Sequence, residues 1–130
     1  MEQKITFITL GVNSLEVSTE FYEKKMGWKR SEMSSGDLVV FDMNGLNLAL
    51  YPREELAKDA TVSADGSGFR GVTFSYNAGS EAEVDSIIST LEQRGVTVVK
   101  APEKVFWGGY SGYISDPDGN LWEIAYNPFL

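Results

Sequence analysis

The sequence predicts an α+β fold built from two tandem modules, each a strand, a helix and three further strands. Strand-like segments rich in β-branched residues alternate with helices marked by capping residues and apolar stripes. The order then repeats: residues 5–7 (ITF) are echoed by residues 72–74 (VTF) about 67 residues later. Because one helix covers only one sheet face, the two βαβββ modules should form a cupped mixed sheet around a cavity.

The first module is predicted over residues 1–59. Residues 4–12 are rich in β-branched side chains and should form its first strand. Ser14 is a candidate helix N-cap, and Gly27 suits the left-handed position just after the helix. The intervening helix should bury an apolar stripe, formed by Val17, Phe21, Tyr22 and Met26.

Three strands and a helical turn should complete this module, followed by a linker at residues 60–68. The strands are expected at residues 28–34, 37–44 and 46–52. Turns at Ser35-Gly36 and Asn44-Gly45 would separate them, and Asn-Gly is a strong hairpin signal. The helical turn is expected at residues 53–58.

The second module is predicted over residues 69–128. It starts with a strand at 69–77, followed by a capping box formed by Ser80 and Glu83. The helix should bury Val84, Ile87, Ile88 and Leu91 and end at Gly95. Strands are expected at residues 96–100, 105–108, 110–115 and 121–127, and the alternative for 105–108 is an irregular segment. Residues 116–119 (DPDG) should form the last hairpin turn.

Composition excludes several kinds of chemistry. The 130 residues include no cysteine and no histidine. Disulfides, thiolate nucleophiles, Ser-His-Asp arrangements and the usual nitrogen ligands of transition metals are therefore excluded. The net charge of −8 opposes binding to nucleic-acid phosphates or anionic membranes.

No targeting or membrane segment is evident. No apolar run approaches the roughly 20 residues that cross a bilayer, and the N-terminus lacks the pattern of a signal peptide. A cytoplasmic location is therefore expected.

Three stretches carry a resemblance to a known family. They are residues 8–28 (ITLGVNSLEVSTEFYEKKMGW), residues 71–77 with 80–85 (GVTFSYN and SEAEVD), and residues 108–128 (GGYSGYISDPDGNLWEIAYNP). With the doubled module they resemble the vicinal oxygen chelate superfamily, which includes glyoxalase I, extradiol dioxygenases, fosfomycin-resistance enzymes and bleomycin-binding proteins. The resemblance spans nearly the whole chain and implies a single glyoxalase-like domain over residues 1–130.

The resemblance also implies where metal ligands would stand. Metal-dependent members carry His, Glu or Gln on the first and last strand of each module. Glu123 matches one of these four positions, whereas Ala49 stands at its equivalent in the first module. The other two positions hold Phe7 or Thr9, and Val72 or Phe74, depending on register. Since catalytic metal sites normally have three protein ligands, we expect no metal and no cofactor. A hard ion held largely by water is the alternative.

Glu123 is the candidate catalytic residue. Strand alternation places it on one face with Leu121 and Ala125, while Trp122, Ile124 and Tyr126 should face a helix. Glu123 would then face the cavity, where it could accept a hydrogen bond from a ligand or act as a general acid or base. The alternative is an ancestral remnant that is paired with Arg, Tyr or water.

Aromatic residues near the end of the chain should line a pocket, although packing in a core or an interface is the alternative. Phe106 belongs to this group, and Arg53 could reach the cavity mouth or remain solvated. The predicted ligand-binding residues are Phe7, Thr9, Tyr51, Trp107, Tyr110, Tyr113 and Glu123.

Two functions follow as hypotheses. The first is a metal-independent small-molecule-binding protein, similar to the bleomycin-binding branch. The second is a lyase-like or isomerase-like enzyme that uses Glu123 as proton-transfer base or as ligand of a weakly held ion. A structural module without a pocket is a third possibility. As relatives of this kind usually pair, the resemblance also implies a homodimer.

Overall fold

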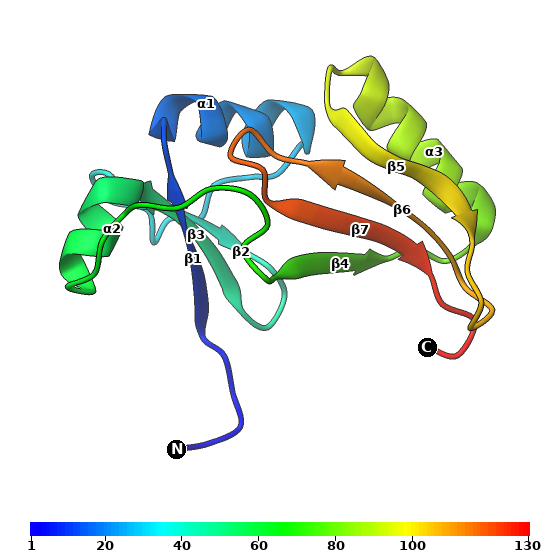
Figure 1. Ribbon diagram of the computed structural model, residues 1–130, viewed down its shortest axis with the longest axis horizontal. Helices are drawn as coiled ribbons and strands as arrows, with labels where there is room; N and C mark the ends of the chain where they lie inside the picture. Colours follow the sequence, from blue (N-terminus) through cyan, green and yellow to red (C-terminus); the bar gives the residue numbers. More distant parts are fainter. The chain divides into compact units, whose positions relative to one another are not determined.

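A computed structural model describes all residues from Met1 to Leu130, and it contains two compact units. Unit 1 is Met1–Gly66 and unit 2 is Ser67–Leu130, so the division falls within the segment predicted as a linker. In each unit a sheet carries a helix on one face (Figure 1). The predicted α+β fold with two βαβββ-type modules is confirmed, although unit 1 has one strand fewer than predicted.

Unit 1 has three strands. Its elements are β1 (Phe7–Val12), α1 (Leu15–Glu20), the π-helix η1 (Phe21–Lys25), β2 (Val39–Asp42), β3 (Asn47–Pro52) and α2 (Arg53–Asp59). The sheet order is β1-β3-β2, with β1 parallel to β3 and β2 antiparallel to it. Ser14 caps α1 as predicted, because its Oγ accepts a hydrogen bond from the Val17 amide at 3.2 Å.

The buried stripe of the first helix differs from the prediction. Phe21 and Tyr22 are buried as expected, but Val17 is 51% exposed, whereas Ser18 and Thr19 are buried. The buried positions keep helical spacing, but two of them hold small polar residues that a search for apolar residues overlooks. After Glu20 the helix continues as η1, whose wider turn ends where the Met26 amide donates to the Phe21 carbonyl at 3.0 Å.

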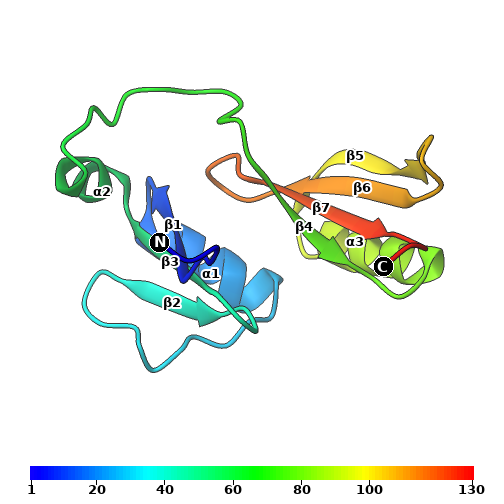
Figure 2. The same cartoon turned by 90° about the horizontal axis from the view of Figure 1, so that it is seen from below.

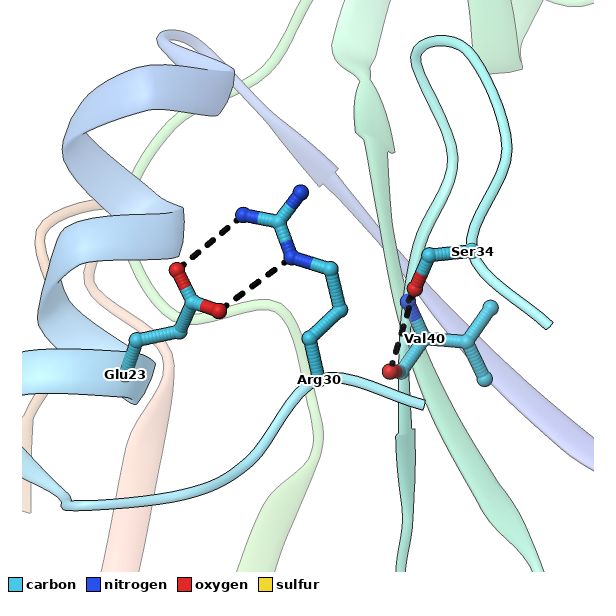
Figure 3. A network of polar contacts seen from close by, with 4 residues as sticks. All are labelled: Glu23, Arg30, Ser34 and Val40. Atoms are coloured by element: carbon cyan, nitrogen blue, oxygen red, sulfur yellow. Dashed lines mark hydrogen bonds and ion pairs between the residues drawn. The ribbon is translucent and has the colours of Figure 1, made fainter. Parts of the chain in front are cut away.

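The strand predicted at residues 28–34 is wrong, because this segment forms a loop with a turn. Backbone pairing with β2 is limited to the Ser31 amide, which donates to the Val40 carbonyl at 2.7 Å. At Ser34 the side chain, in place of the backbone carbonyl, bonds to β2: its Oγ accepts a hydrogen bond from the Val40 amide at 2.9 Å (Figure 3). Arg30 reaches back to Glu23 of η1 with bonds of 3.0 and 3.2 Å, which fixes the loop against the helix (Figure 3).

Unit 2 has a four-stranded mixed sheet. Its elements are β4 (Thr73–Asn77), α3 (Glu81–Gln93), β5 (Thr97–Lys104), β6 (Tyr110–Ser115) and β7 (Leu121–Tyr126). The order β4-β7-β6-β5 places β7 between a parallel and an antiparallel neighbour (Figure 2). The expected strand at 105–108 is instead a turn, in which the Val105 amide donates to the Gly109 carbonyl at 3.0 Å. Gly108, within this turn, has a φ of 96°, which glycine adopts without a steric penalty.

The helix α3 begins and packs nearly as predicted. Ser80 Oγ accepts from the Glu83 amide at 3.1 Å, as in a capping box. The Glu83 carboxylate accepts from the Gly79 amide at 2.7 Å, whereas in a standard capping box it would accept from the amide of the cap residue, Ser80. Three of the four predicted stripe residues are buried, namely Val84, Ile88 and Leu91. None of the helices in either unit has the length and apolar character needed to span a membrane.

Candidate functional site

A row of polar side chains crosses the four-stranded sheet on one face. Glu123 on the central strand β7 pairs with Ser75 on β4 and with Tyr113 on β6, and Tyr113 pairs in turn with Lys100 on β5. Residues directly opposite each other on neighbouring strands point to the same face. The row therefore brings two hydroxyls and an ammonium group alongside one carboxylate.

The opposite face of this sheet packs on α3. A Cβ at Gly112 would lie 2.7 Å from Cδ1 of Ile88, so Gly112 and its partner Ile124 face the helix. Trp122 and Ile124 are 6% and 2% exposed, whereas Glu123 between them is half-buried. Strand alternation thus places Glu123 away from the helix, as the sequence pattern predicts.

Hydroxyl groups are the hydrogen-bond donors to Glu123. The Ser75 hydroxyl donates to Glu123 Oε1 at 2.8 Å. On the other side, partial burial and then the charge and hydrogen bond of Glu123 raise the pKa of Tyr113. The Tyr113 phenol therefore stays protonated and serves as a donor to the carboxylate.

The two lysines near the row have other acidic partners. Lys100 lies 2.9 Å from Glu103, and this contact raises the pKa of Lys100, to which Tyr113 and Glu123 also contribute. Lys104 Nζ lies 3.3 Å from Glu81 on α3. Neither ammonium group makes its ion pair with Glu123.

A hollow of ≈ 380 Å³ lies over the part of this row formed by Glu123, Tyr113 and Lys100. It is lined by Lys100, Glu103, Lys104, Val105, Phe106, Trp107, Ser111, Tyr113 and Glu123. The Trp107 indole lies directly over Gly109, where a Cβ would overlap the ring. The absence of a side chain at Gly109 therefore permits Trp107 to form this wall of the hollow.

The predicted site residues of unit 2 divide between the two faces of the sheet. Trp107, Tyr113 and Glu123 meet in the hollow, together with Phe106. Tyr110 lies on the α3 face, where its hydroxyl donates to Asp85 Oδ1 at 2.6 Å. The hydrogen bond to Asp85 raises the pKa of Tyr110. Because Tyr110 lies on the helix-facing side of the sheet, it is not part of the group around Glu123.

The remaining predicted residues lie in unit 1. Thr9 pairs with Ala49 and Phe7 with Asn47 across β1 and β3, while Tyr51 pairs with Gly11 at the end of the same ladder. Arg53, at the start of α2, donates to the Ala64 carbonyl at 2.8 Å and so holds the segment after α2.

The register of β4 corrects the expected equivalents of the metal-ligand positions. Phe74 pairs with Trp122 on the helix-facing side, with ring centroids 5.0 Å apart, and Val72 lies outside the strand. The residue opposite Glu123 is Ser75, one position further along the chain. A shift of one residue moves a side chain to the other face, which is why the sequence echo missed Ser75. Lys100 was also missed, because its place depends on the register of β5 with β6.

The donor set of this row does not fit a transition-metal centre. It offers one carboxylate with two neutral hydroxyls, whereas such sites normally have three strong protein ligands. The corresponding positions within unit 1, Thr9 and Ala49, hold one hydroxyl and one methyl group. Groups of three or more acidic residues placed to hold an ion are absent from the structure.

A second hollow, of ≈ 520 Å³, lies along α1 and η1 in unit 1. It is lined by Leu15, Glu16, Thr19, Glu20, Glu23, Lys24, Arg30, Gly36 and Val39. Thr19 is 7% exposed, and its Oγ1 makes no hydrogen bond. This hollow has charged walls of both signs and no aromatic side chain, so it is not the pocket that the aromatic residues predicted.

Comparison with known proteins agrees with this architecture. The model of the family described as "Glyoxalase/Bleomycin resistance protein/Dioxygenase superfamily" matches residues 4–124. The chain belongs to this superfamily. The family resemblance drawn from the sequence is therefore confirmed at the level of the superfamily.

Proteins that are similar to this chain carry different descriptions. A probable trivalent organoarsenical cleaving enzyme from Bacillus subtilis is 31% identical over 132 residues, covering 92% of this chain and 79% of that protein. A virulence protein of Salmonella typhimurium is 25% identical over 126 residues, covering 94% and 83%. The crystal structure of a glyoxalase-related enzyme from Fulvimarina pelagi matches with a TM-score of 0.85 and 32% identity, covering 98% of this chain and 90% of that one.

Proposed function

We propose that this superfamily member binds a small organic molecule without a metal ion, in the hollow over Glu123. The observation that carries the proposal is the pairing of Glu123 with Ser75 and Tyr113. Two hydroxyl donors stabilise a carboxylate that is free to accept a further hydrogen bond, but they add no strong metal ligand. The volume of ≈ 380 Å³ lies within the usual range of ligand pockets, roughly 300–1,000 Å³.

The test is metal analysis of the purified protein together with a thermal-shift series of divalent ions. A ligand that binds only the folded state raises the melting temperature, so an ion site would appear as a stabilisation. We expect Zn, Ni, Mn, Mg, Fe(II) and Ca to give no stabilisation that Glu123→Gln removes. Copurification of an ion near one per chain, or a shift that depends on Glu123, would overturn the metal-free proposal.

A lyase-type or isomerase-type enzyme is the second candidate. The adjacent Glu123 and Tyr113 supply a carboxylate base and a protonated phenol on one face of the sheet. Two similar relatives are described as organoarsenical-cleaving, one of them as probable. This chain has no cysteine and no histidine, so any related chemistry here would use neither a thiolate nor an imidazole group.

Turnover assays can separate the two candidates. Isomerisation of the hemithioacetal of methylglyoxal and glutathione is a suitable first reaction, measured with and without added Mg²⁺ or Mn²⁺. The enzyme hypothesis requires a rate that Glu123→Gln reduces by about a hundredfold or more, the usual size of a general-base contribution. The binding hypothesis predicts that the wild-type protein and the variant are equally inactive.

A further inference from the structure

We infer that the hollow over Glu123 selects small organic cations, namely protonated amines attached to an apolar or aromatic body. This inference rests on the proposed binding function and specifies its ligand class. It follows from the partners of the acidic and basic side chains that line the hollow.

Glu123 is the carboxylate of the hollow that an ammonium group would complement. Its hydrogen-bond partners in the row, Ser75 and Tyr113, are neutral, and Lys100, whose pKa Glu123 also raises, makes its ion pair with Glu103 instead. The other acidic lining residue, Glu103, is already paired with Lys100 at 2.9 Å. A half-buried carboxylate without an ion-pair partner attracts a cation and gains a charge-assisted hydrogen bond from it.

The basic side chains around the hollow do not favour an anion. Lys100 is held by Glu103, and Lys104 is held by Glu81. An incoming carboxylate or phosphate would have to compete with these acids and would also approach Glu123. The net charge of −8 adds a long-range field that favours cations over anions.

The aromatic wall suits the same ligand. The Trp107 indole is held against Gly109 and remains 38% exposed, while Phe106 beside it is 102% exposed. Indole and phenyl faces attract ammonium groups and cover apolar ligand surface. The small volume of the hollow, ≈ 380 Å³, limits the ligand to a compact molecule.

Three probes of similar size and different charge test the inference. Phenethylamine is a cation at neutral pH, 2-phenylethanol is neutral and 3-phenylpropanoate is an anion. Binding can be followed by amide and indole chemical-shift changes in ¹⁵N-labelled protein. We expect phenethylamine to bind about tenfold more tightly than 2-phenylethanol, with shifts at Trp107 and Glu123, and the anion to bind most weakly.

Two variants locate the preference. Glu123→Gln should reduce phenethylamine binding to the level of 2-phenylethanol and leave the neutral probe unchanged. Glu92→Gln removes the same charge from an exposed position on α3 outside the hollow, and it should keep the preference. The probe series on the wild-type protein does not depend on either variant remaining folded.

The outcomes separate the inference from the proposed function. Equal or tighter binding of the neutral or anionic probe would overturn the inference while leaving a binding pocket. A cation preference that survives Glu123→Gln, or is lost in Glu92→Gln, would assign selectivity to the general acidic surface and also overturn it. Failure of all three probes to shift the residues of the hollow would contradict the proposed binding function itself.

Discussion

At the scale of single residues, Glu123 shows how strand position determines chemistry. Its neighbours in sequence, Trp122 and Ile124, are buried, yet its own side chain lies on the opposite face between two hydroxyls. A buried-looking strand can hold a glutamate here because alternate residues face different surroundings. The charge of Glu123 in turn contributes to the raised pKa of Tyr113.

Replacing Glu123 should change the titration of Tyr113. Burial raises the pKa of Tyr113 first, and the Glu123 carboxylate raises it further. Glu123→Gln should therefore lower the pKa of Tyr113 yet leave it above the ordinary tyrosine value. The ultraviolet absorbance of ionised tyrosine measures this, with Tyr113→Phe identifying the signal. As a control, Asp85→Asn should lower the pKa of Tyr110 and leave that of Tyr113 unchanged. An unchanged Tyr113 titration in Glu123→Gln would contradict the contact between Tyr113 and Glu123.

The raised pKa of Tyr113 also predicts how the stability of the protein depends on pH. Because the pKa of folded Tyr113 lies above the unfolded value of about 10, the folded state binds the phenolic proton more tightly. This contribution to stability is complete below pH of about 10 and is lost as the pH rises through the folded pKa. Denaturant unfolding should show a steeper alkaline loss in wild type than in Tyr113→Phe. Parallel curves for the two proteins would argue against a raised pKa.

Gly109 should control the position of Trp107. In Gly109→Ala the new methyl group would overlap the indole, which can rotate away because it is a side chain. We expect a change in tryptophan fluorescence and in the Trp107 indole NMR signal, with stability altered by about 1 kcal/mol or less. In a Trp107→Leu background the same substitution should have little effect. An unmoved indole signal in Gly109→Ala would show that the ring is not held by this glycine.

At the scale of elements, the contact between α3 and its sheet depends on close approach. Gly112 of β6 lies where a Cβ would meet both Ile88 of α3 and the backbone of β5. Irregular pairing between β5 and β6, with register shifts around Lys100, occurs at the same place. The helix and two strands thus meet around a position that only a glycine fills without displacement.

Gly112→Ala should destabilise unit 2. Its Cβ would lie 2.7 Å from Ile88 Cδ1 and 2.8 Å from the Lys100 carbonyl oxygen, and a backbone atom cannot rotate away. Overpacking of this kind costs about 1–3 kcal/mol, measurable by chemical denaturation. Ile88→Val removes the Cδ1 contact alone, so the double variant should remain less stable than Ile88→Val. Equal stability of these two proteins would show that β5 moves aside without cost.

Elements with strong local signals were predictable, whereas those set by pairing or register were not. Local chemistry determines three of these elements, namely the Ser80 cap, the buried stripe of α3 and the Asp116–Gly119 turn. In this turn the Gly119 amide donates a hydrogen bond to the Asp116 carbonyl at 3.1 Å. The loop at 28–34 was mistaken for a strand because Ser34 uses its side chain in place of a backbone bond. Ser75 and Lys100 could not be placed beside Glu123 without the register of their strands.

At the scale of the whole molecule, the acidic charge is poorly balanced by ion pairs. The chain has 19 acidic and 11 basic residues. The ion pairs Glu23–Arg30, Glu103–Lys100 and Glu81–Lys104 lie at exposed or half-exposed side chains. Such pairs contribute little in water, so repulsion among the excess carboxylates opposes the compact state at low ionic strength.

Added salt should therefore stabilise the protein at neutral pH. Raising NaCl from a few millimolar to physiological concentration shortens the screening length to about 8 Å, which weakens repulsion among the excess carboxylates. We expect the melting temperature to rise by about 2–4 °C, measured by scanning calorimetry. Near the isoelectric pH of ≈ 4.5 the excess charge disappears, so the same addition should have almost no effect. An equal rise at both pH values would mean that the salt acts on apolar surface, because screening requires a net charge to screen.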